Sequence, residues 1–194
     1  MVSRRLSWAV AQLGRKPGAA QVLARCVDVD DLPAAHRPWR RTDERTWRTG
    51  VSAAAEPWAA SARDAGSITV WRSFASAPAQ RTLWVQVVPL ARIEDGQAAL
   101  AAVSRSELRN LRAKVSVVAT TEILPTPSVP GASLVSATEQ QTRGDGNTGS
   151  VLTLRYVVRA DMVVMSAASP DRGSAWTWPD LLTLAAAQAR KLTA

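Results

Sequence analysis

The chain has 194 residues, of which 46% are hydrophobic and 21% charged, so it is long and apolar enough to fold around its own core. It carries a formal net charge of +8 and eight tryptophans, but only one cysteine, one histidine, one tyrosine and one phenylalanine. This composition excludes an intrachain disulfide and a zinc site built from several cysteines and histidines.

Residues 1–31 are predicted to form an N-terminal helical arm or extension, followed by a single domain over residues 32–194. An apolar stripe at helical spacing marks the start of this extension. The stripe is formed by Leu6, Val10 and Leu13. A second short helix is expected over residues 19–27, and the acidic residues that follow it end the helical pattern.

The N-terminal segment does not read as an export signal. Gln12 and the Arg15-Lys16 pair interrupt its apolar stretch, and no apolar signal precedes Cys26 to make it a lipobox cysteine. No run of the chain approaches the ~20 apolar residues that a membrane-spanning helix needs. We therefore expect a cytoplasmic protein with no transmembrane segment.

The chain is polar and rich in arginine from His36 to Gly50, and a helix is expected over residues 53–65. Pro57 lies near the first turn of that helix and Gly66 follows its end, as helix boundaries favour. Alternation of apolar and polar residues then predicts six strands. They are residues 67–74, 82–90, 115–123, 132–141, 151–158 and 162–169.

Two longer helices are expected among and after these strands. Residues 94–112 carry an apolar stripe at helical spacing. The sequence Thr177-Trp178-Pro179-Asp180 resembles a capping box with proline in the first turn, so a C-terminal helix is predicted to follow it. Hairpin strands broken by single helices predict an α+β fold, an antiparallel sheet of about six strands flanked by helices in an α/β/α sandwich.

One family shares this arrangement. The step Asp31-Leu32-Pro33 followed by Trp39, the paired hairpin strands and the closing amphipathic helix are similar to PsbP-like α/β/α sandwich domains, which include small bacterial proteins of unknown function. The resemblance covers about residues 31–192. It implies the same sandwich fold and implies no catalytic residues, because the family shares none.

The sequence contains few candidate residues for catalysis or for metal binding. His36 lies in a polar, proline-flanked stretch, and no Gly-x-Ser-x-Gly nucleophile elbow accompanies it. A Cys26–His36 dyad is one alternative, against a cysteine that is simply a small buried residue. A cation site at Asp28, Asp30 and Asp31 is another, against carboxylates that cap a turn. We predict no catalytic residues, no metal site and no cofactor.

The strongest indication of function is a segment in which arginines and tryptophans lie close together. Its candidate binding residues are Trp39, Arg40, Arg41, Arg45, Trp47 and Arg48. Guanidinium groups beside indole rings favour anionic and aromatic partners. The alternative is that the rings pack on the sheet while the arginine stems cover them and the charged heads stay in water.

We therefore predict a non-enzymatic binding module that contacts a protein partner or a small ligand through this Arg/Trp-rich segment. The alternative is a nucleic-acid or polyanion binder that uses the basic clusters at residues 37–48 and 105–114. A small enzyme that works with carboxylates and arginine, without histidine, is a third hypothesis.

Overall fold

The computed structural model describes residues 18–48, 62, 65–66, 68–76, 80–112, 115–144, 147–169 and 176–194. The apolar stripe expected before residue 18 lies outside these residues, as does most of the helix expected over residues 53–65. Ala62 and Ala65, which are described, are helical. In the ranges described, no helix is both long enough and apolar enough to cross a membrane.

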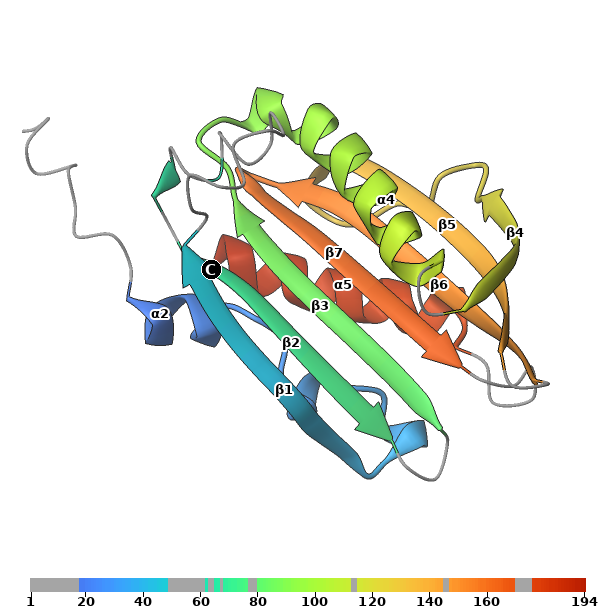
Figure 1. Cartoon of the computed structure of the whole chain (residues 1–194). Coiled ribbons are helices and arrows are strands. Elements are labelled where there is room, and N and C mark those ends of the chain that lie inside the picture. The colour runs from blue at the N-terminus through green and yellow to red at the C-terminus, as the bar shows by residue number, and fades with distance from the viewer. Residues whose placement is uncertain are drawn as a thin grey trace, which may run out of the picture.

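The centre of the fold is a seven-stranded sheet in which every neighbouring pair is antiparallel (Figure 1). The strands are β1 (Trp39–Arg48), β2 (Ile68–Ser76), β3 (Arg81–Pro89), β4 (Ser116–Glu122), β5 (Ala132–Gly144), β6 (Asn147–Val158) and β7 (Asp161–Ser169). Their order in the sheet is β1-β2-β3-β7-β6-β5-β4. The sheet therefore consists of two meanders, β1–β3 and β4–β7, that meet where β3 pairs with β7.

The prediction of about six strands is wrong by one, because β1 adds a seventh. The six predicted segments correspond to β2–β7. Among the strands that the structure describes, β1 lies at the edge of the sheet and pairs with β2 alone, and almost all of its side chains are exposed. Its sequence consequently lacks the alternation of apolar and polar residues that reveals a strand with one buried face.

Three helices flank the sheet within the described ranges: α2 (Ala19–Ala24), α4 (Gly96–Arg112) and α5 (Trp178–Thr193). Short 3₁₀ turns, η1 (Val29–Asp31), η2 (Ala34–His36) and η4 (Ile93–Asp95), connect them to the strands. Helix α4 crosses one face of the sheet and α5 crosses the other (Figure 1). We call these the α4 face and the α5 face.

Each face has its own hydrophobic cluster because successive strand residues point to opposite sides. On the α5 face, Phe74, Leu154 and Tyr156 pack with Leu181 of α5. On the α4 face, strand residues pack against Leu100 and other residues of α4. Val22, Cys26 and Val27, which belong to the predicted extension, are buried in the α5-face cluster.

The predicted capping box at the start of α5 is present. Thr177 Oγ1 accepts from Asp180 N at 3.3 Å, and the Asp180 carboxylate accepts from Thr177 N at 3.4 Å. We expect Thr177→Ala to lower the free energy of unfolding by about 1 kcal/mol, because it leaves a helix-end N–H without its side-chain acceptor.

Urea denaturation of the two proteins measures this difference. Thr183→Ala is the matched control, because Thr183 lies inside the same helix, is exposed and donates only to Pro179 O within it. We expect the control to change stability by less than about 0.5 kcal/mol. Equal losses in both variants would contradict a specific role for the cap.

Candidate functional site

The six residues of the Arg/Trp-rich segment all lie on β1, but the strand divides them between the two faces of the sheet. Trp39 and Arg41 pair with Ser76 and Phe74 of β2 and turn toward the α5 face, where Trp39 and Phe74 belong to the same cluster. A register shift between Arg41 and Asp43 interrupts the ladder. The structure therefore does not bring the six side chains together.

Trp39 is an internal anchor rather than a contact residue. It is only 7% exposed, its indole Nε1 donates to Pro33 O at 3.0 Å, and its ring centroid lies 5.4 Å from that of Trp176. These contacts hold the turn before β1 against the start of α5. Trp39 is thus unavailable to a partner, which is the packing role that the sequence left open for it.

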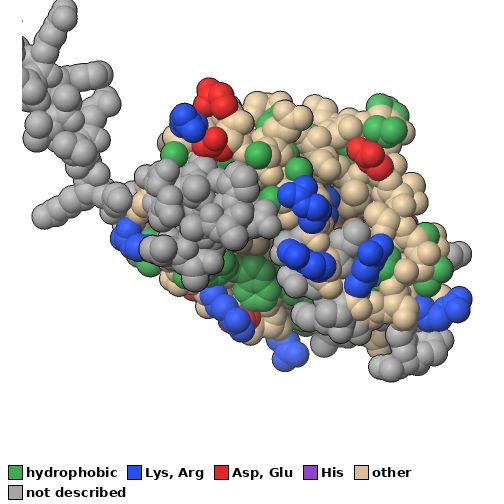
Figure 2. Space-filling model, turned by 45° about the horizontal axis from the view of Figure 1, so that its top comes forward, with side chains coloured by type: hydrophobic (Ala, Val, Ile, Leu, Met, Phe, Trp, Pro, Cys, Tyr) green, Lys and Arg blue, Asp and Glu red, His purple; other side chains and the backbone are tan. Residues whose placement is uncertain are grey.

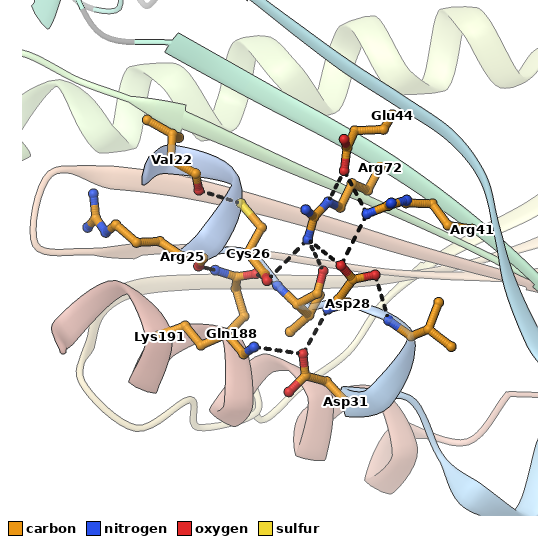
Figure 3. Close-up of polar contacts among 12 residues, drawn as sticks. Val22, Arg25, Cys26, Asp28, Asp31, Arg41, Glu44, Arg72, Gln188 and Lys191 are labelled. Atoms are coloured by element: carbon orange, nitrogen blue, oxygen red, sulfur yellow. Dashed lines mark hydrogen bonds and ion pairs between the residues drawn. The ribbon is translucent and has the colours of Figure 1, made fainter. Parts of the chain in front are cut away.

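Arg41 belongs to an ion-pair network on the α5 face (Figure 3). Its Nη1 lies 3.1 Å from Asp28 Oδ2 and 2.9 Å from Glu44 Oε2. The same two carboxylates meet Arg72, whose Nε is 2.7 Å from Glu44 and whose Nη1 is 3.5 Å from Asp28. Arg72 Nη1 also donates to Val27 O at 2.8 Å, so the network ties the chain before β1 to β1 and β2.

The acidic residues before β1 serve the same local structure. Asp28 Oδ1 accepts from Val29 N at 2.8 Å, and Asp31 Oδ2 accepts from Asp28 N at 2.7 Å. Lys191 of α5 places its Nζ 2.9 Å from Asp31 (Figure 3). These carboxylates are thus committed to turn capping and to ion pairs. Of the residues placed in the structure, no three His, Cys, Asp or Glu side chains are grouped to hold a metal ion.

The two residues of the possible catalytic dyad, Cys26 and His36, have different interaction partners. Cys26 is buried, and its Sγ donates to Val22 O at 3.4 Å. His36 Nε2 lies 3.8 Å from Asp180 Oδ2 at the start of α5, and its ring meets Trp176 edge-on. Burial raises the pKa of the Cys26 thiol to about 11, with the positive charge of Arg72 opposing the rise.

We expect native protein at pH 8 to resist alkylation by iodoacetamide, because a thiol with this pKa is almost fully protonated. Mass spectrometry of protein treated with iodoacetamide, with and without urea, measures the extent of alkylation. The raised pKa also means that the protonated thiol supports the fold below about pH 9 and that this contribution declines as pH rises toward 11. Rapid modification of folded protein at pH 8 would contradict this description.

Three predicted residues remain exposed on the other side of the strand. Arg40, Arg45 and Trp47 pair with Ala75, Trp71 and Thr69 of β2, and Trp47 is 41% exposed. The Arg45 guanidinium lies 5.6 Å from the centre of the Trp71 ring and forms an ion pair with Asp43 at 2.7 Å. The sixth, Arg48, donates to Gly66 O at 2.7 Å.

Two more tryptophans, Trp71 and Trp84, belong to this face but lie outside the Arg/Trp-rich segment. Trp84 is opposite Ser73, and Trp71 is opposite Gln86, so both rings are on the α4 face and diagonal to one another. Both are half-buried. The signal for them was their place in the alternation, since Trp71 lies out of phase with Val70 and Phe74 of β2, and Trp84 lies out of phase with Leu83 and Val85 of β3. We call Arg40, Arg45, Trp47, Trp71 and Trp84 the Arg/Trp surface.

The second basic cluster lies on the same side of the sheet. Arg105, Arg109 and Arg112 of α4 are exposed and recur at i, i+4 and i+7, so they share one side of the helix. Lys114 lies outside the described residues. Figure 2 looks onto this side of the molecule and shows hydrophobic side chains with Lys and Arg side chains on both sides of them.

A separate trough of about 640 Å³ opens on the α5 face, beside the start of α5. Glu139, Gln141 and Arg143 of β5 line one part of it, and Trp176 and Trp178 line another. A pocket of this size is typical of small-ligand sites. No sequence pattern pointed to it, because it requires that β5 and the start of α5 be neighbours.

No protein-family model and no curated protein matches this chain.

Proposed function

We propose that the protein is a non-enzymatic binding module and that its Arg/Trp surface binds an acidic segment of a partner protein. The observation that carries the proposal is the exposure of Arg40, Arg45 and Trp47 on one side of an edge strand. Arginine and tryptophan are the residue types most enriched where interfaces gain their binding energy.

The position of β1 supports an extended partner segment. Among the described strands only β2 pairs with β1, so within this part of the chain the outer backbone edge of β1 has no strand partner and can accept an added strand. Charged side chains also protect edge strands from unwanted pairing, and the register shift after Arg41 has the same effect. The negative charges of an acidic segment would neutralise the arginine charges that protect this edge, whereas a neutral or basic strand would not.

Affinity capture from native lysate, with nuclease treatment and at two salt concentrations, tests the proposal. We expect the wild type to retain a protein partner after nuclease treatment, and the double variant Arg45→Ala/Trp47→Ala to lose it. Arg190→Ala is the matched control, because it removes one exposed arginine from α5 on the opposite face. Retention of the same partners by the double variant would refute the proposal.

A nucleic acid or another polyanion is the second candidate, and one observation favours it. The half-buried rings of Trp71 and Trp84 share a face with Arg45 and with the side chains of α4, and single-stranded nucleic acids bind to such combinations of aromatic rings and arginines. Fluorescence anisotropy with an oligothymidylate over a range of salt concentrations tests it.

If the oligothymidylate binds, removal of Arg109 and Arg112 should reduce the slope of log affinity against log salt by about 1.4, or about 0.7 for each lost phosphate contact. No binding at low salt would eliminate this candidate.

The finer fold assignment, a PsbP-like α/β/α sandwich, is part of the proposal. The element order supports it, with α4 on one face of the antiparallel sheet and α5 on the other. A cytoplasmic location is also proposed, and it is tested by fractionation of cells that produce the full chain.

A further inference from the structure

We propose that the trough beside the start of α5 binds a neutral, polyhydroxylated ligand, specifically a short oligosaccharide. The trough lies on the α5 face, opposite the Arg/Trp surface, so this would be a second site with its own ligand. It holds about 640 Å³ and is lined by both polar and aromatic side chains, as small-ligand sites are.

One side of the trough is a regular row of hydrogen-bonding groups. Glu139, Gln141 and Arg143 occupy alternate positions of β5, so they point to the same face at intervals of about 6.8 Å. Gln141 is directly opposite Ser150 of β6, and Arg143 is opposite Thr148, which adds two hydroxyl groups to the row. The row therefore presents donors and acceptors in a fixed order.

In the described part of the chain, the side chains of Glu139, Gln141 and Arg143 make no hydrogen bond or ion pair with one another or with their surroundings. A carboxylate only accepts, a guanidinium only donates, and an amide does both. A ligand rich in hydroxyl groups can satisfy all three, because each hydroxyl is both donor and acceptor.

The charges of the trough favour a neutral ligand. Glu139 and Arg143 contribute one negative and one positive charge, with the amide of Gln141 between them. A strongly anionic ligand would meet the carboxylate, and a strongly cationic ligand would meet the guanidinium, each at a cost in free energy. The basic character of the chain as a whole thus does not extend to this site.

The other side of the trough is aromatic and held in position before any ligand binds. Trp176 Nε1 donates to Thr82 O at 3.1 Å, and its backbone N donates to Ser169 Oγ at 3.0 Å. Trp178, at the first position of α5, is half-buried. Trp176 is only 3% exposed and its ring packs against Trp39, so Trp178 is the ring that offers an apolar face to the C–H face of a sugar.

The test is binding of maltotriose, cellotriose, chitotriose and a wider array of neutral glycans to the purified full chain, measured by isothermal titration calorimetry. We expect saturable binding of at least one neutral oligosaccharide. Gln141→Ala and Trp178→Ala should each weaken it at least about tenfold. Gln141 is exposed, so its variant should fold even if Trp178→Ala is impaired.

The Arg45→Ala/Trp47→Ala variant is the matched control, because it changes the opposite face and should bind the glycan with unchanged affinity. Glycan binding in the trough is therefore tested independently of partner binding at the Arg/Trp surface. Three results would overturn the proposal: no neutral glycan binds, binding is unaffected by Gln141→Ala, or only a zwitterionic or acidic peptide probe binds in the trough.

Discussion

Trp176→Ala is expected to lower the free energy of unfolding by about 3–5 kcal/mol, a typical cost of removing a buried aromatic side chain. Trp176 is 3% exposed and belongs to the α5-face cluster, so truncation leaves a cavity there. The indole also links β3 to the start of α5 through its bond to Thr82 O, and its ring lies against Trp39. All these contacts would be lost together.

Arg81 adds to the expected cost. Its guanidinium lies 5.9 Å from the centre of the Trp176 ring, and its Nε and Nη1 are buried without hydrogen-bond partners in the residues that the structure places. Burial lowers the pKa of Arg81, and the Asp180 carboxylate opposes that effect. The indole ring lies beside this charge together with the Asp180 carboxylate, so its removal leaves the charge less stabilised.

Urea denaturation followed by far-UV circular dichroism measures the loss as a shift in midpoint at unchanged slope. Trp47→Ala is the control, because that ring is 41% exposed, and we expect it to change stability by no more than about 0.5 kcal/mol. Trp176→Phe should fall between the two, since it keeps a ring but loses the N–H donor. A loss below about 1 kcal/mol in Trp176→Ala would contradict its role as an anchor.

Arg72→Met is expected to lower the free energy of unfolding by about 3 kcal/mol, since it removes a buried cation from its contacts with two carboxylates and two backbone carbonyl groups. The Arg72 side chain is 6% exposed and contacts Glu44, Asp28 and the carbonyl oxygens of Cys26 and Val27. Methionine retains much of the volume, so the loss reports the missing hydrogen bonds and charge rather than a cavity. The two carboxylates are partly exposed and recover some hydration, which limits the loss.

Arg41→Ala is the matched control for Arg72→Met, because Arg41 meets the same two carboxylates from a position where its side chain is 39% exposed. We expect a loss of less than about 1 kcal/mol, as for other exposed ion pairs. The difference between the two variants, measured by chemical denaturation, isolates the effect of burial. Equal losses would show that the network derives its strength from charge alone.

Much of the fold was predictable because its signals are local. The alternation in β2–β7 needs only neighbouring residues to be read, and so does the capping box that begins α5. Strand β1 escaped detection because an edge strand with exposed side chains lacks a buried face and hence an apolar period. The trough could not be predicted because it lies between β5 and the start of α5, which are far apart in the chain.

The sequence identified the Arg/Trp-rich segment but not how its side chains divide between the faces of the sheet. The segment forms β1, where Trp39 is buried and Arg41 is engaged in ion pairs. Strand pairing decided this division, because the register with β2 and the shift after Arg41 determine which side chains meet the core. The same pairing placed Trp71 beside Arg45.

By itself, then, the sequence determined the α+β class, the six regular strands, the two long helices and the segment richest in arginine and tryptophan, since each is encoded within a few residues. Only the tertiary structure decided which side chains of that segment are exposed on the α4 face, which tryptophans accompany them, and that a trough forms on the opposite face. Those outcomes depend on contacts between residues distant in the chain, and no local period records such contacts.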